Sequence, residues 1–425
     1  MRLKRDSLGT PIPNFNSDAF DRARVSSPVT IFDDKHLYGK NTIGKTGLFN
    51  WIYIESGGLA TYNGSDSAID LATDLTSGSS VIKQTRRYLQ YEPGKSQLYQ
   101  FTGVFGDTTE AVEQKVGPFE NNNGLYFGVF SGGQYGVGVR NDATGTVVNS
   151  IVYQTEWNND VMDGSGKKNN PSRLNLDRTK GAVWVIDHQW LSMGSVRFGM
   201  QIGSDLHIVH ESHHANLSAL PYTRTPTLPI RYEIKNLDTL TTSVNLKSIC
   251  AVAISEGAES IESPTFHVTH ASSLRTVGVK EPVMAVRLLN SYLGRDTRIK
   301  AKFRTSDFYA AANDSLFTVE HVTAPNSIEA NWLQVDSGVS AMEYTLDITS
   351  IDGGTVFNVF NTYVGGGSGK KGGSEGNISG SARDPHEFIV QNFDSTESEV
   401  FVIYAQSVPG ANANVGVVFA WEEVQ

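Results

Sequence analysis

From residue 82 onward, short runs in which apolar and polar residues alternate are separated by turn residues. GLYFGVF (124–130) and QYGVGVR (134–140) flank the tripeptide SGG, and AVWVIDHQWL, SVRFGMQI and DLHIVHESHH follow one another with only a few residues between them. Alternation with period two is typical of strands that have one buried face, and this close spacing of turns is typical of a sandwich or barrel. Because no helical pattern of useful length competes, the sequence predicts an all-β fold.

One pair of runs suggests a specific hairpin. QTRRYLQY (84–91) and QLYQFTGVF (97–105) stand on either side of Pro93 and Gly94, which are turn-forming residues. The pattern predicts that the two runs pair as neighbouring strands of a β-hairpin.

The chain has 425 residues, which exceeds the usual size of a single hydrophobic core. A polar stretch with Pro264 interrupts the alternation at 255–275. We therefore expect two tandem β-sandwich or jelly-roll-like domains, at 81–260 and 275–425, behind an extended N-terminal arm with short strands at 1–80.

The arm is polar and contains only short apolar pieces, at 29–32 and 48–55. Two interpretations are open: neighbouring chains hold it, or it packs on its own domain. Residues 1–45 show no sustained alternation, and ordering them costs about 1–2 kcal/mol per residue. The sequence therefore predicts that this part lies across an adjacent subunit or another protein of the same particle.

Two basic groups are candidates for such contacts. The first is at the start of the arm, in a chain of net charge −10, and the second is in the glycine-rich loop 364–381, whose length is typical of partner-binding or crossing loops. The possible interaction residues are Arg2, Lys4, Arg5, Lys370 and Lys371.

Composition excludes several classes of protein. A net charge of −10 disfavours nucleic-acid binding, which depends on Lys and Arg neutralising phosphates. The sequence contains no run of 18 apolar residues, so it predicts no membrane-spanning helix. The basic residues at its start are not followed by the apolar core of a secretory signal. Cys250 is the only cysteine, so no intramolecular disulfide can form. Its apolar surroundings predict a small buried side chain.

The densest group of possible metal ligands is HIVHESHH at 207–214. On a regular strand, His207, Glu211 and His213 would share one face, and His210 and His214 the other. This arrangement splits the ligands, and the group lacks the helical H-E-x-x-H spacing. We therefore predict no metal site here.

Three other groups suggest chemistry only weakly. GGGSGKK (365–371) departs from the phosphate-loop pattern, and Asp160 and Asp163 lack the spacing of a calcium loop. Asp187 and His188 lie near Ser192 and Ser195 in sequence, but no G-x-S-x-G turn accompanies them. The sequence therefore predicts no catalytic residue, no cofactor and no metal.

Aromatic residues gather in two places. Arg86, Arg87, Tyr88, Tyr91 and Tyr99 form a basic and aromatic group, and Trp157, Trp184 and Trp190 follow. Such side chains either stack on sugars or fill a core. The alternation around Trp184 predicts burial on both faces of its strand, which favours the core.

The order of several motifs resembles a family of virion structural proteins of tailed, often marine, bacteriophages. The motifs are RYLQYEPGK (87–95), GLYF (124–127), WNNDVMDGSG (157–166), DHQWLSMGSVRFG (187–199), LPIRYEI (228–234) and WEE (421–423). The resemblance covers most of 82–425 and leaves out the arm. It implies a non-enzymatic structural role in a virion and provides no catalytic residues.

Two functions are therefore expected. The first is a structural component of a bacteriophage virion, made in the host cytoplasm, with copies of itself and other virion proteins as partners. The alternative is a carbohydrate-binding module on a viral tail that recognises host-surface glycans through exposed Trp and Tyr side chains. Neither function involves nucleic acid or membrane, and a depolymerase would require a carboxylate pair or a nucleophile that the sequence does not display.

Overall fold

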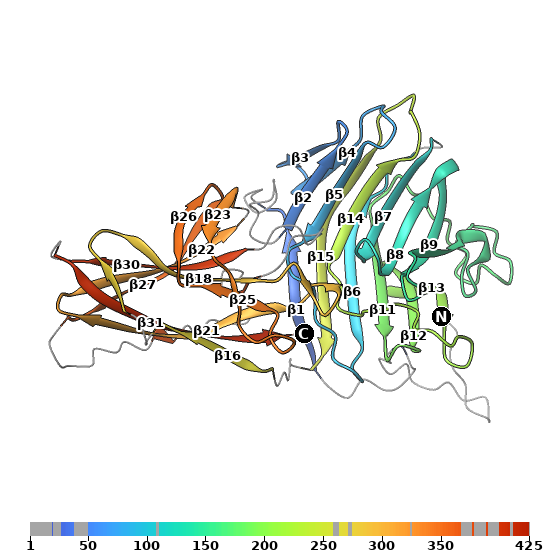
Figure 1. Ribbon diagram of the computed structural model, residues 1–425. Helices are drawn as coiled ribbons and strands as arrows, with labels where there is room; N and C mark the ends of the chain where they lie inside the picture. Colours follow the sequence, from blue (N-terminus) through green and yellow to red (C-terminus); the bar gives the residue numbers. More distant parts are fainter. Residues whose placement is uncertain are drawn as a thin grey trace. The chain divides into compact units, whose positions relative to one another are not determined.

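The computed structural model describes residues 19, 27–37, 50–107, 110–257, 263–270, 274–323, 325–366, 376–377, 388–389, 399–408 and 411–424. The chain divides into two compact units, residues 1–259 and 260–425. Within the described residues, all strand pairings are antiparallel, as Figure 1 shows for both units.

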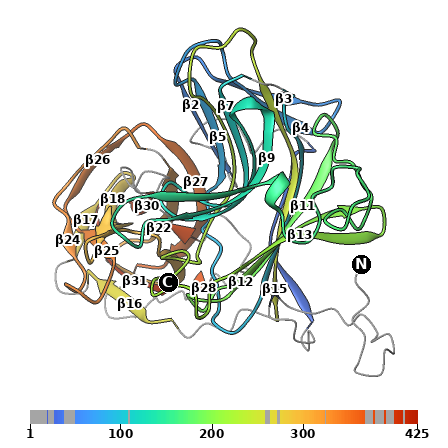
Figure 2. The same ribbon diagram turned by 90° about the vertical axis from the view of Figure 1, so that its right-hand side faces the viewer.

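The first unit is a sandwich of two sheets, whose two layers are visible in Figure 2. Within its described part, an eight-stranded sheet has the order β13-β12-β11-β6-β15-β4-β3, with β1 also beside β15, and a seven-stranded sheet has the order β10-β9-β8-β7-β14-β5-β2. The eight-stranded sheet consists of β1 (Pro28–Lys35), β3 (Leu59–Asn63), β4 (Ala68–Ala72), β6 (Gln97–Val104), β11 (Ala182–Gln189), β12 (Ser195–Ile202), β13 (Asp205–His213) and β15 (Asn245–Glu256).

The seven-stranded sheet consists of β2 (Asn50–Glu55), β5 (Ser80–Thr85), β7 (Val112–Pro118), β8 (Gly124–Phe130), β9 (Gln134–Asn141), β10 (Val148–Tyr153) and β14 (Ile230–Asn236). Short 3-10 turns, η1 (Ser131–Gly133) and η2 (Gln154–Glu156), join β8 to β9 and follow β10.

The second unit is also a two-sheet sandwich. Within its described part, one sheet has the order β16-β31-β21-β28, with β17 beside β31 and β29 beside β21, and the other has the order β24-β25-β18-β30-β22-β27. Two small pairs, β19 with β20 and β23 with β26, complete it. The strands are β16 (Thr265–Thr269), β17 (Arg275–Val277), β18 (Glu281–Leu288), β19 (Ser291–Tyr292), β20 (Arg295–Asp296), β21 (Lys300–Ala311), β22 (Ser315–Thr323), β23 (Ser327–Ala330), β24 (Leu333–Gln334), β25 (Met342–Thr345), β26 (Ile348–Asp352), β27 (Thr355–Val364), β28 (Gly376–Asn377), β29 (Phe388–Ile389), β30 (Val400–Ser407) and β31 (Ala413–Val424).

Alternating side chains form each core, as the sequence predicted. In β6, Tyr99 and Phe101 are fully buried while their neighbours in the strand are only half-buried. They pack with Trp184 and Phe198 of the same sheet and Phe127 of the facing sheet. The all-β sandwich fold is therefore confirmed.

The predicted hairpin at 84–105 is wrong. The turn forms, with the Lys95 N–H donating to the Glu92 carbonyl at 3.1 Å, but β5 lies in the seven-stranded sheet and β6 in the eight-stranded sheet. The segment between them crosses from one layer to the other. Alternation reports which face of a strand is buried, and it does not report which sheet the strand joins.

The N-terminal segment differs from a separate arm wherever it is described. β1 pairs with β15, β2 pairs with β5, and β3 and β4 extend the eight-stranded sheet. Residues 28–35 and 50–80 therefore pack on their own unit, because the edges of β15 and β5 offer backbone groups that need partners. The remaining residues of the predicted arm, apart from 19, 27, 36 and 37, lie outside the described residues.

Cys250 is exposed, and the prediction of a buried side chain is wrong. A register shift between Ser248 and Cys250 interrupts the pairing of β15 with β6. The inserted residue reverses the alternation, so that Ala251 and Ala253 point into the core and Cys250 points outward.

A buried ion pair joins the two sheets of the first unit. The Lys83 Nζ of β5 lies 2.7 Å from the Asp34 carboxylate of β1, and both side chains are at most 5% exposed. Lys83 also lies 5.1 Å from the centre of the Tyr232 ring. Since a buried charge is costly without its partner, this contact fixes β1 against the opposite layer.

A buried carboxylate plays a comparable role in the second unit. Glu423 of β31 is 1% exposed and accepts hydrogen bonds from the Ser340 hydroxyl, the Ala341 N–H at 2.8 Å and the Trp421 indole N–H at 3.1 Å. These bonds connect the segment before β25 to β31.

Replacing Asp34 with alanine should destabilise the first unit by about 3–5 kcal/mol, because it leaves the Lys83 ammonium buried without a counter-charge. The matched control is Asp33→Ala. Asp33 is the neighbouring residue, and its exposed contact with Lys35 should contribute at most about 1 kcal/mol. Urea unfolding measures both. Equal losses for the two variants would contradict the role assigned to the buried pair.

Candidate functional site

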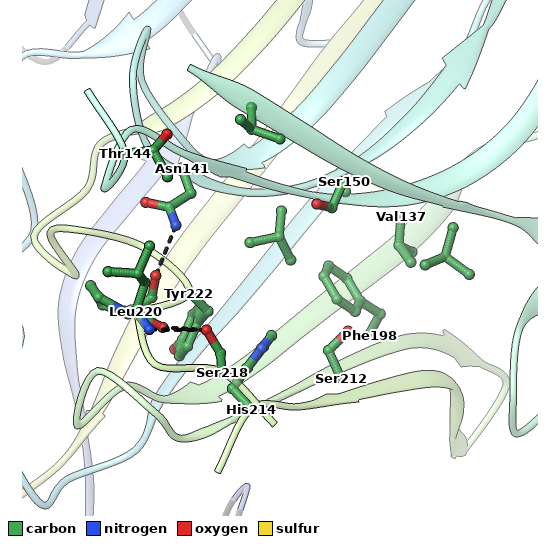
Figure 3. A pocket seen from close by; sticks show the side chains of 15 residues that line it. Val137, Asn141, Thr144, Ser150, Phe198, Ser212, His214, Ser218, Leu220 and Tyr222 are labelled. Carbon is green, nitrogen blue, oxygen red and sulfur yellow. Dashed lines mark hydrogen bonds between the residues drawn. The ribbon is translucent and has the colours of Figure 1, made fainter. Parts of the chain in front are cut away.

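A pocket of about 310 Å³ lies between the two sheets of the first unit, where both sheets end at their edge strands β10 and β13. Figure 3 shows the side chains that line it. The lining residues are Val137, Gly138, Val139, Asn141, Thr144, Val148, Ser150, Val152, Phe198, Ser212, His214, Ser218, Leu220, Pro221 and Tyr222.

The β9–β10 hairpin forms one wall. Its register pairs Val137 with Val152 and Val139 with Ser150, so these side chains share the inner face of the seven-stranded sheet. Strands β12 and β13 supply Phe198 and Ser212 to the opposite wall. The pocket is therefore an opening at the rim of the sandwich core.

The segment 214–222 forms the third side of the pocket. The Asn141 side-chain amide donates to the Pro221 carbonyl at 2.8 Å, and the Tyr222 N–H donates to the Ser192 carbonyl at 3.1 Å. The rings of His214 and Tyr222 stack, with centroids 4.4 Å apart and planes 17° apart. These contacts hold the segment against both sheets before any ligand binds.

The polar groups of the pocket fall into two sets. Asn141 and Ser218 are engaged within the protein, because Ser218 both donates to the Leu220 carbonyl and accepts from the Leu220 N–H. By contrast, the hydroxyls of Ser150 and Ser212 and the imidazole of His214 have no hydrogen-bond partner among the described residues. The two serines come from facing walls. In Figure 3 these two side chains lie on opposite sides of the pocket, and Phe198 lies between them.

His214 in the lining and His188 behind it are neutral near pH 7. Burial lowers the pKa of His214 to about 4, and the nearby His213 adds to this effect. Behind the pocket, His188 Nδ1 lies 3.3 Å from the Tyr222 hydroxyl, and burial lowers its pKa to about 4 against the opposing influence of Asp187. The lining contains no Asp, Glu, Lys or Arg, so the pocket carries no formal charge.

The basic residues proposed from the sequence for partner contacts are not among these groups. Arg2, Lys4, Arg5, Lys370 and Lys371 all lie outside the described residues, so they remain a prediction.

The histidine cluster is arranged differently from the predicted alternation. A register shift beside Phe198 in the pairing of β12 with β13 places His207 opposite Met200 and His210 opposite Phe198, both core residues. Glu211 and His213 are opposite Arg197 and Ser195 on the other face, so the assignment of His207 to their face is wrong. Within the described part of the chain, no group of three or more His, Cys, Asp or Glu residues has the geometry of a metal site.

Asp187 and His188 contact residues other than Ser192 and Ser195, which lie near them in sequence. The Asp187 carboxylate accepts from Arg197 at 2.7 Å and from Ser96 at 2.5 Å, and His188 contacts Tyr222. Asp187 is thus held by an arginine and a serine hydroxyl from neighbouring segments.

Sequence reasoning missed a row formed by Ser195, His213 and Glu211. Ser195 Oγ lies 3.2 Å from His213 Nδ1, and His213 Nε2 lies 3.5 Å from Glu211. The imidazole is 59% exposed and lies on the opposite face of β13 from Ser212. The row is therefore a surface feature separate from the pocket.

The loop with Asp160 and Asp163 is internally bonded. Asp160 accepts from the Met162 and Ser172 N–H groups, and Asp163 accepts from the Ser165 N–H and the Asn170 amide, all at 2.8–3.1 Å. These bonds lower the pKa of Asp163 to about 2, the largest effect coming from Ser165. The carboxylates stabilise the loop.

The aromatic residues proposed as sugar platforms are mostly core, as predicted. Tyr88, Tyr91 and Tyr99 are at most 5% exposed, and Trp157 and Trp184 at most 3%. Trp190 is partly buried and packs against the same core, with its indole N–H donating to the Thr223 carbonyl at 3.0 Å.

A second missed cluster lies on the outer face of the seven-stranded sheet. The fully buried Arg231 guanidinium donates to Gln84 and Asn121 at 2.8 Å and to Glu233 at 3.2 Å. Burial alone would raise the pKa of Glu233, but Lys115, Arg231 and other cations outweigh it and lower the pKa to about 2. In the sequence IRYEIKN (230–236), apolar and polar residues alternate, a pattern that is typical of a strand whose Arg231 and Glu233 side chains face solvent. The sequence alone therefore did not reveal that these two side chains form a buried ion pair.

Comparison with known proteins gives structural similarity only. No family model matches the chain, and no curated protein matches it. The CBM2 module of the evolved Dit of Lactobacillus casei BL23 phage J-1 covers 55% of this chain and 99% of its own length, at 7% identity and a TM-score of 0.32. The match with peanut lectin covers 54% of this chain and 98% of the lectin, at 12% identity and a TM-score of 0.28. The match with the legume lectin-like domain of Entamoeba histolytica covers 48% of this chain and 89% of that domain, at 10% identity and a TM-score of 0.28.

At these values the matches transfer neither residues nor activity, and the sandwich architecture rests on the strand pairings themselves. No helix among the described residues is both long enough and apolar enough to cross a lipid bilayer.

The buried neutral histidines make the first unit acid-sensitive. His36 and His188 have pKa values lowered to about 4 by burial, compared with 6.5 in the unfolded chain. The unfolded state therefore binds more protons between these values, and stability is lost as the pH falls from 6.5 to 4, by up to about 3 kcal/mol for each histidine.

The measurement is urea unfolding at pH 7, 5.5 and 4.5. His188→Gln should flatten the pH dependence, because it removes one of the two buried imidazoles. A wild-type stability that stays constant across this range would refute the assignment.

Proposed function

We propose that this chain is a non-enzymatic structural protein of a bacteriophage particle whose first β-sandwich binds carbohydrate in the pocket between β10 and β13. The pocket is the observation that carries the proposal. Its volume of about 310 Å³ is at the lower end of small-molecule sites, which suits one or two sugar units.

The chemistry of the walls supports a saccharide ligand. Val139, Val152 and Leu220 offer apolar contact to the C–H face of a sugar ring, while the uncommitted Ser150 and Ser212 hydroxyls can exchange hydrogen bonds with sugar hydroxyls. Such a combination of apolar contact with a few directed polar groups is the general pattern of small-molecule recognition.

The same lining supports binding without catalysis. Glycoside hydrolysis requires two carboxyl groups that flank the scissile bond. None of the lining side chains is a carboxylate, and Asp187 is engaged by Arg197 and Ser96. The pocket therefore offers contacts and lacks the carboxylate pair that glycoside hydrolysis requires.

The assignment to a phage particle rests on the order of motifs in the sequence. RYLQYEPGK, WNNDVMDGSG and DHQWLSMGSVRFG resemble a family of virion structural proteins, and they occupy the crossing between the sheets, the loop before β11 and the β11–β12 hairpin. The proposal includes assembly with further copies of the chain and with other virion proteins. The basic groups at Arg2, Lys4 and Arg5 and at Lys370 and Lys371 are the proposed contacts.

Carbohydrate binding is tested with a glycan array and titration calorimetry on the full chain. Val148→Trp should reduce affinity at least 10-fold, because Val148 lines the pocket and a bulky ring there would fill it. Val147→Trp is the matched control, since Val147 is similarly exposed and does not line the pocket. Absence of binding to every glycan, or an equal loss in both variants, would refute the proposal.

Incorporation into particles is tested by mass spectrometry of purified phage that encodes this chain, with immunogold labelling to locate it. Deleting residues 1–26 should leave the first unit folded, because β1 begins at Pro28, and should abolish incorporation. Normal copy number of the truncated chain in particles would exclude the arm as the anchor. Absence of the full-length chain from particles would exclude the virion assignment.

A further inference from the structure

We propose that the pocket between β10 and β13 selects neutral sugars that carry a methyl group, either as an N-acetyl substituent or as a 6-deoxy carbon. This inference rests on the proposed carbohydrate binding and narrows its ligand class. Three features of the lining carry it: absence of charge, the apolar character of its reachable walls, and the small number of free hydrogen-bonding groups.

The absence of charge excludes acidic sugars. An anionic ligand would have to lose the hydration of its carboxylate in a site whose lining contains no Lys or Arg. Arg224, two residues after Tyr222 in the chain, is already paired with Asp142 at 2.6 Å. A cationic ligand would likewise lose its hydration without gaining a counter-charge, because the lining has no Asp or Glu.

The reachable walls are largely apolar. Val148 and Leu220 are 49% and 45% exposed at the mouth, and Val139, Val152 and Pro221 are half-buried behind them. A sugar that presented only hydroxyls to these side chains would leave those hydroxyls without partners. A methyl group instead gains contact with the valine and leucine side chains, and one such group in an apolar pocket is commonly worth about 10-fold or more in selectivity.

The polar capacity of the pocket is small. Asn141 and Ser218 are occupied in holding the segment 214–222, which leaves the neutral His214 imidazole and two hydroxyls for a ligand within the described lining. The two hydroxyls are those of Ser150 and Ser212. They lie on opposite walls (Figure 3) and can engage two hydroxyls on opposite edges of one ring. A 6-deoxy sugar has one hydroxyl fewer to satisfy and therefore fits better than its fully hydroxylated counterpart, whereas an N-acetyl sugar relies on the contact of its methyl group with the apolar walls.

The experiment uses matched sugars in calorimetry and saturation-transfer NMR with the full chain. N-acetylglucosamine is compared with glucose and glucuronic acid, and L-fucose with L-galactose. We expect at least one methyl-bearing sugar to bind about 10-fold more tightly than its hydroxylated counterpart, with the strongest saturation transfer at the methyl protons, and glucuronic acid to bind more weakly than glucose. Preference for the N-acetyl or for the 6-deoxy member supports the inference and identifies the source of the methyl group.

Equal affinity within each matched pair, or tighter binding of glucuronic acid, would overturn the inference while leaving carbohydrate binding intact. Failure of every sugar here and on the glycan array would instead overturn the proposed function, and the inference with it.

Two substitutions in the pocket and one control outside it sharpen the test without disturbing the core. Val148→Thr replaces one methyl of the wall with a hydroxyl and should reduce the methyl preference several-fold, while Val147→Thr outside the pocket should leave it unchanged. Ser150→Lys places a cation in the exposed mouth and should reverse the order of glucose and glucuronic acid. If Val148→Thr and Val147→Thr behave alike, or if Ser150→Lys leaves the order unchanged, the pocket is not the selecting site.

Discussion

The first unit depends on the pairing of β15 along both of its edges. One edge is paired with β6, and the other is paired first with β4 and then with β1. Four segments far apart in the sequence are thereby held in one sheet by backbone hydrogen bonds, and the layer they form supplies half of the core. Without β1, the half of β15 from Cys250 to Glu256 would present unpaired N–H and C=O groups, which is the usual starting point for unwanted association.

The polar contacts of this unit follow from the same arrangement. Because β1 lies in the eight-stranded sheet and β5 in the other sheet, Asp34 and Lys83 meet across the interior, where water cannot screen them. The Tyr232 hydroxyl crosses the same gap and donates to the Thr102 and Cys250 carbonyls at 3.0 Å. Interlayer hydrogen bonds of this kind fix the register of one sheet on the other, which apolar packing alone determines only loosely.

The sequence revealed the strands better than their partners. Alternation identified β8, β9, β11, β12 and β13 and the burial of Trp184, because each of these depends on local period-two patterning. It failed at the segment 86–96, where a turn of ordinary composition leads to a different sheet, and at the two register shifts that reorient Cys250 and His207. A single inserted residue leaves no compositional trace, although it reverses the face of every residue beyond it.

The pocket was equally invisible in the sequence. Its walls consist mainly of apolar and small polar side chains from the segments 137–152 and 198–222, and these residues form no recognisable motif. What makes them a site is their position at the rim of the sandwich, where the two edge strands β10 and β13 stand apart and the segment 214–222 closes the third side. Titratable residues drew attention to the segment 207–214 instead, yet His214 is the one titratable residue of that segment that lines the pocket.

The position of β31 has a consequence for the order in which the chain can fold during synthesis. All strands of the first sandwich lie before residue 257, so that unit can close while the rest of the chain is still being made. In the second sandwich, β31 at 413–424 lies between β16 and β21 and carries Glu423, which holds the segment at Ser340 and Ala341. The sheet that contains β16 and β21 therefore cannot be completed until β31, more than a hundred residues downstream, has been synthesised. During that interval the exposed edges of β16 and β21 are the part of the nascent chain most in need of protection from premature pairing.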